Sequence, residues 1–61
     1  MRTGTTKQMI AGQRRSLEAI KRKLEAMSAE WADVDAFNES ELQSLAEKCI
    51  EVGEGLVAPD D

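Results

Sequence analysis

Few side chains in this chain have covalent or acid–base chemistry available to them, because the chain has one cysteine and no histidine. Cys49 lies among Leu45, Ala46 and Val52, a setting that predicts a small buried apolar residue. A catalytic thiol or serine needs an activating base, and histidine is the commonest one. The sequence therefore predicts no catalytic residue and a protein that is not an enzyme.

A cluster of carboxylates is the next candidate for chemistry, since oxygen ligands suit Ca²⁺ and Mg²⁺. Its members are Asp33, Asp35, Glu39 and Glu41. An EF-hand loop that began at Asp33 would need glycine at its sixth position and glutamate at its twelfth, where this chain has Asn38 and Ser44. We therefore expect no metal and no cofactor.

Basic residues recur along the first half of the chain at helical spacing. They are Lys7, Arg14, Arg15, Lys21 and Arg22. Such a stripe is typical of contacts with phosphates or with an acidic protein, and it equally fits a solvated helix face. The net charge of −4 opposes nucleic-acid binding, and the basic half has no aromatic residue for base stacking.

The charge is strongly divided between the two parts of the chain. Residues 1–23 carry seven basic and one acidic residue, a net of +6, whereas residues 24–61 carry one basic and eleven acidic residues, a net of −10. In an antiparallel dimer the basic part of one chain can lie against the acidic second helix of the other, so that opposite charge sets the register.

Large apolar residues between Ile10 and Val34 alternate at steps of three and four, apart from a polar break at Gln13. This is a heptad pattern, with its a positions at Ile10, Leu17, Leu24 and Trp31 and its d positions at Ile20, Met27 and Val34. Such a seam requires another helix to cover it. The predicted partner or dimer seam comprises Ile10, Leu17, Ile20, Leu24, Met27 and Trp31.

Capping signals divide the chain into two helices. Thr5 and Gln8 have the spacing of a capping box and predict a first helix over about residues 6–32. After a turn at 33–38, Asn38 and Glu41 form a similar box, with Phe37 and Leu42 spaced as a hydrophobic staple. The second helix is then expected over about 39–53, ending at its glycines.

The two predicted helices are unequal in length and in the width of their apolar faces. A second helix of about 15 residues would span ~22 Å and reach back only to about Glu18. Met9, Ile10 and the seam up to about Leu17 would then extend beyond it. The second helix has a broad apolar face, which predicts contact with two neighbours.

Together these patterns predict an all-α antiparallel helical hairpin, with a long first and a short second helix, which dimerises into a four-helix bundle or short coiled coil. The hairpin spans residues 6–56, between disordered segments at 1–5 and 57–61. We expect a small cytoplasmic regulatory or adaptor protein that binds itself and another protein through helices, with no membrane or small-molecule partner. The alternatives are an RNA- or DNA-binding hairpin dimer and a purely structural self-assembling element.

Overall fold

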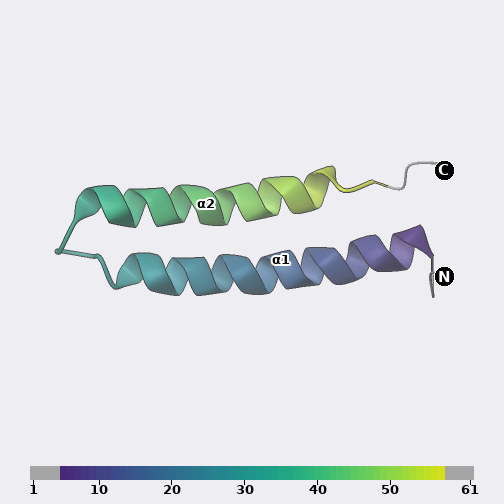
Figure 1. Cartoon of the computed structure of the whole chain (residues 1–61), viewed down its shortest axis with the longest axis horizontal. Helices are drawn as coiled ribbons and strands as arrows, with labels where there is room; N and C mark the ends of the chain where they lie inside the picture. The colour runs from purple at the N-terminus through teal and green to yellow at the C-terminus, as the bar shows by residue number, and fades with distance from the viewer. Residues whose placement is uncertain (1–4, 58–61) are drawn as a thin grey trace.

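The computed structural model describes residues 5–57 and contains two α-helices, α1 (Thr6–Ala29) and α2 (Ala36–Gly55). They run antiparallel and side by side, joined by a short turn at one end (Figure 1). No strand occurs among residues 5–57. This architecture confirms the predicted all-α helical hairpin. The segments predicted to be disordered, 1–5 and 57–61, lie outside the described residues apart from Thr5 and Val57.

The start of α1 is the capping box that the sequence predicts. The Thr5 hydroxyl oxygen accepts the backbone N–H of Gln8 at 3.1 Å, and the Gln8 side-chain oxygen accepts the backbone N–H of Thr5 at 2.9 Å. The box satisfies the N–H of the cap residue and one of the four N–H groups that a helix start leaves without a partner. Two residues three positions apart thus fix where α1 begins.

The turn between the helices starts three residues earlier than predicted. After Ala29 the chain tightens, with backbone N–H groups donating to carbonyls three residues back at Glu30, Trp31 and Ala32. Asp33 then adopts a left-handed conformation with φ 65°, which aspartate tolerates better than most residues do. This reverses the chain, and the Trp31 carbonyl accepts the N–H groups of the two residues that follow Asp33.

The predicted start of the second helix at Asn38 is wrong. Asp35 is the N-cap, and its carboxylate accepts the backbone N–H of Asn38 at 3.0 Å. Aspartate and asparagine are comparably good caps, but Asp35 brings a negative charge to the positive end of the helix and adds a turn. Phe37 therefore lies inside α2, largely exposed, and not in the predicted staple before the helix.

A small core joins the two helices. Leu24 of α1 packs with Ala46 and Cys49 of α2, and Leu17 and Leu42 cover it partly. Cys49 is thus the small buried apolar residue that its sequence setting predicts. Near the turn, Ser28 is 2% exposed and its hydroxyl donates to the Glu39 carbonyl at 2.9 Å. This bond fixes the end of α1 against the first turns of α2.

The second helix ends at its glycines as predicted, but at Gly55, two residues beyond the predicted residue 53. It has 20 residues against 24 in α1. α2 therefore reaches back past Glu18, so that Gly53 lies beside Leu17 and Arg14. The overhang therefore does not extend to Leu17; of the other residues predicted there, Ile10 is half-buried and Met9 is exposed. Helical glycines are unfavourable, yet Gly53 does not end this helix, whose last carbonyls find donors elsewhere.

Candidate protein-binding surface

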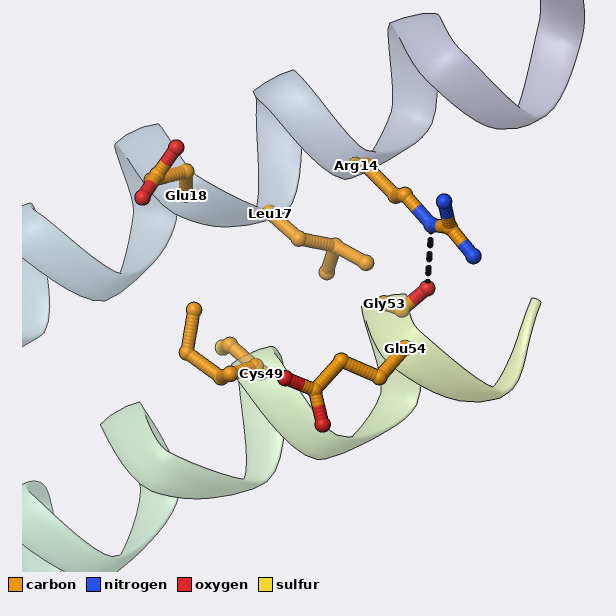
Figure 2. A pocket seen from close by; sticks show the side chains of 7 residues that line it. Arg14, Leu17, Glu18, Cys49, Gly53 and Glu54 are labelled. Atoms are coloured by element: carbon orange, nitrogen blue, oxygen red, sulfur yellow. Dashed lines mark hydrogen bonds between the residues drawn. The ribbon is translucent and has the colours of Figure 1, made fainter.

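Arg14 of α1 supplies hydrogen-bond donors for the last carbonyls of α2. Its Nε donates to the Gly53 carbonyl at 2.7 Å, and its Nη2 donates to the Leu56 carbonyl at 3.0 Å. Figure 2 shows the guanidinium reaching from α1 across to the last turn of α2. A cation at this position both satisfies carbonyls and complements the negative end of the helix. Arg14 therefore holds the two helices together at the end of the hairpin opposite the turn, which we call the open end.

Two open grooves lie between the helices. The first has a volume of about 350 Å³ and is shown in Figure 2; its lining residues are Arg14, Leu17, Glu18, Cys49, Ile50, Gly53 and Glu54. The second, nearer the turn, has a volume of about 430 Å³; it is lined by Glu25, Ser28, Ala29, Ala32, Glu39, Gln43, Ala46 and Glu47. Both have small or aliphatic residues at the bottom and carboxylates at the rim.

Both grooves lie on one face of the hairpin, which we call the grooved face. On the helical wheel of α1, Glu18 and Glu25 lie to one side of the buried Leu17 and Leu24, and on α2 the groove residue Ile50 lies to the matching side of Cys49.

Among residues 5–57 no group of three or more cysteine, aspartate or glutamate side chains has a geometry that could hold a metal ion.

The opposite face carries large apolar side chains that remain exposed. They are Ile20 and Met27 of α1, Trp31 of the turn, and Leu45 and Val52 of α2, with exposed fractions between 36% and 50%. We call these five residues the apolar face. Each lies three or four positions from a buried residue and on the side away from the grooves, so the five form one surface along both helices.

Charge is sparse on this surface. On α1, Gln13 and Ser16, two turns and one turn before Ile20, are uncharged, and Lys23 lies on the outer rim between Ile20 and Met27. On α2 the outer rim carries Glu41 and Lys48, one turn to either side of Leu45. A nearly uncharged apolar strip with a charged rim has the composition of a protein-binding surface.

The predicted seam is divided between α2 and solvent. Its a-position residues Leu17 and Leu24 face α2, together with residues of the e position such as Ser28. The other predicted seam residues, Ile20, Met27 and Trp31, are exposed on the apolar face, while Ile10 is half-buried near the open end. Two hydrogen bonds between the helices account for this division. Arg14 and Ser28, both at e positions, donate to carbonyls of α2, so α2 packs on the side of the seam where they lie.

The basic residues proposed for contacts with an acidic partner or nucleic acid also separate. Arg14 bonds to α2, and Lys21 pairs with Glu25 at 3.5 Å. Lys7, Arg15 and Arg22 are exposed on α1. The two ion pairs within the part of the chain that the structure describes, Lys21–Glu25 and Lys48–Glu51, involve none of these three residues.

Sequence reasoning missed the roles of several residues. Ser28 was not singled out from the sequence, because it occupies an e position beside the apolar seam. Gly53 was read as a stop, although it is buried against Leu17. Leu45 and Val52 were placed in the apolar face of the second helix, but only the structure separates them from the buried Cys49.

No protein-family model, curated protein or solved structure matches this chain. Neither α1 nor α2 combines the length and the apolar character that crossing a lipid bilayer requires.

Proposed function

We propose that this protein is a non-enzymatic regulatory or adaptor protein that acts by helix-mediated protein–protein binding, with the apolar face as its binding surface. The observation that carries the proposal is the exposure of Ile20, Met27, Trp31, Leu45 and Val52 on one side of both helices. Monomeric proteins rarely keep contiguous apolar strips open to water. A helix of the partner lying along this strip would bury them in the manner of a helical bundle.

The size of the core supports the same conclusion. Within residues 5–57 the buried apolar residues are Leu24, Ala46 and Cys49. A single core in a chain of 61 residues rarely supplies more than about 3–5 kcal/mol, and small proteins gain the remainder from staples or association. The only cysteine is Cys49, so no internal disulfide can form. Burial of the apolar face by a partner adds the missing contacts.

A matched pair of isoleucines tests this function. Ile20 lies on the apolar face and Ile50 lines a groove on the opposite face. We expect Ile20→Ser to abolish capture of partner protein by the immobilised chain and to weaken any self-association seen by light scattering. Ile50→Ser should retain both, with circular dichroism confirming that each variant remains helical. Equal behaviour of the two variants would contradict the proposal.

A second candidate function is binding of RNA or DNA by the basic side of α1. It is favoured by the exposure of Lys7, Arg15 and Arg22, which leaves three cations on α1 for phosphate contacts. The use of Arg14 within the hairpin weakens it. Binding to a duplex RNA probe should fall steeply as salt rises and should be lost in the double variant Arg15→Gln/Arg22→Gln. Negligible binding at low salt removes this candidate.

A further inference from the structure

The folded hairpin has unlike charges at its two ends, a feature that the linear charge division does not reveal. The open end, made of residues 5–22 and 46–57, carries six basic and four acidic residues, a net of +2. The closed end, residues 23–45 including the turn, carries one basic and six acidic residues, a net of −5. The basic half of α1 lies beside the acidic α2, so the remaining polarity runs along the length of the hairpin (Figure 1).

We infer that the occupant of the apolar face is a second copy of this chain, packed with its turn at the opposite end of the bundle. This inference rests on the proposed function and names its partner. Two copies with turns at the same end would place a net of −5 directly against −5. With turns at opposite ends, each negative closed end lies against a positive open end, which favours that orientation.

The rim of α2 is self-complementary in the same orientation. Leu45, at the middle of the apolar face, lies between Glu41 and Lys48, and the midpoint of that charged pair falls at the same place. A two-fold axis beside Leu45, with the two α2 helices antiparallel, brings Glu41 of each chain level with Lys48 of the other. Two equal ion pairs then flank the Leu45 contact, as an isologous interface requires.

The register of the hairpin places this axis near its middle. The Ser28–Glu39 bond and the approach of Leu17 to Gly53 show which residues of α1 and α2 lie level. By these pairs Leu45 is level with about residue 23 of α1, close to the centre of the apolar face. The axis therefore centres the shared surface, and Ile20 and Met27 of each copy lie within about two helical turns of it.

The mass of the chain in solution is the first test. Light scattering at high protein concentration should give a dimer, and Ile20→Ser and Leu45→Ser should raise its dissociation constant at least tenfold while Ile50→Ser does not. A wild-type monomer at every concentration overturns the second copy as occupant but leaves protein binding intact. If the dissociation constant of the dimer is unchanged by Ile20→Ser and by Leu45→Ser, the apolar face is not the binding surface, and the proposed function is overturned as well.

Orientation is tested by one distance between copies. In the variant Ala11→Cys/Cys49→Ala, a spin label at position 11 is exposed near the open end. Turns at opposite ends put the two labels about 35 Å apart along the bundle, at ~1.5 Å per residue over about twelve residues on each side of the axis. Turns at the same end leave only the sideways separation, about 20 Å. A short distance overturns the proposed arrangement.

A charge exchange tests the rim pairs. Glu41→Lys should raise the dissociation constant of the dimer roughly five- to tenfold, because two attractions become repulsions. Adding Lys48→Glu should restore the wild-type value, since the pairs re-form with reversed sign. These two residues lie seven positions apart on one helix and do not contact each other within a copy. Lys48→Glu alone also breaks the Lys48–Glu51 pair, so stronger association of the double variant than of either single variant reports a contact between copies. Failure of the second change to rescue association overturns this pairing.

Discussion

The grooved face and the apolar face of this hairpin are built from the same two helices, yet they meet solvent very differently. The grooved face has recesses bounded by charged side chains such as Glu18, Glu25 and Glu47. The apolar face presents large side chains from both helices at one-third to one-half exposure and little charge. The grooved face therefore has the charged rim of an ordinary solvent-exposed surface, whereas the apolar face has the composition of one side of a core.

The difference follows from where α2 packs on the heptad pattern of α1. A helix that covered the a and d positions equally would have buried Ile20 and Met27. Here α2 covers the a and e positions, because Arg14 and Ser28 make polar bonds to it from the e register. The d positions Ile20 and Met27 are left exposed, and so is Trp31, the a position that lies in the turn. In a four-helix bundle, such positions contact a second neighbouring helix.

The largest effect that separates the two surfaces should come from paired leucine truncations. Leu24→Ala removes the largest buried side chain of the hairpin core and should lower the free energy of unfolding by about 3 kcal/mol at every protein concentration. Leu45→Ala should cost less than about 1 kcal/mol in dilute solution, because Leu45 is half exposed. Its cost should grow with concentration as association adds to stability. Urea denaturation at two concentrations measures both.

The same pair separates two positions that the sequence pattern alone does not distinguish. By pattern alone, Leu24 and Leu45 look like equivalent core positions, and both truncations would be equally severe. If Leu45→Ala were as destabilising as Leu24→Ala in dilute solution, Leu45 would belong to the core of the single hairpin. The apolar face would then be smaller than described.

The next effect concerns the bond that decides which seam positions α2 covers. Arg14→Ala should lower the free energy of unfolding by about 1–2 kcal/mol, because it removes charge-assisted bonds to two carbonyls at a partly solvated site. Hydrogen exchange should quicken in the last turn of α2. Arg15→Ala, one position along the same helix, should change stability by less than about 0.5 kcal/mol.

A result in which both arginine variants lose equal stability would contradict this account. It would mean that the Arg14 contacts add nothing beyond general charge. A loss at Arg14 without faster exchange near Gly53 would instead place its contribution elsewhere in the hairpin.

What the sequence could predict was local. The start of α1 is fixed by Thr5 and Gln8, residues three apart, so pattern reasoning found it. The start of α2 was misplaced by one turn because two good caps, Asp35 and Asn38, compete within four residues and local rules do not rank them.

What the sequence could not predict depends on distant contacts. The end of α2 depends on Arg14, which lies 39 residues away from Gly53 in the chain. Likewise, a repeat of apolar residues identifies Ile20 and Leu24 as members of one seam. It does not say which of them will face the neighbouring helix and which will remain exposed. That division is set by tertiary hydrogen bonds, which leave no periodic signal.

The smallest effect should be a gain in stability. A Cβ at Gly53 would lie 3.5 Å from Leu17 Cδ1 and 3.7 Å from Arg14 Cγ, both ordinary contact distances. Gly53→Ala should therefore raise the free energy of unfolding by about 0.5–1 kcal/mol through helix propensity, without loss of association. Gly12→Ala, where no atom lies within 4 Å, is the control for propensity alone. A loss of stability at Gly53 would show closer packing of the helices than described.

The most direct test of the central claim is an isotope-filtered NMR experiment on a mixture of labelled and unlabelled chain. It detects methyl groups that lie close to protons of another copy. We predict intermolecular contacts from the methyl groups of Ile20, Leu45 and Val52 and none from Ile50 in the groove. Contacts from Ile50 without contacts from Ile20 would show that the grooved face is the interface. Their absence from all four residues in a chain of monomeric mass would show that no second copy covers the apolar face.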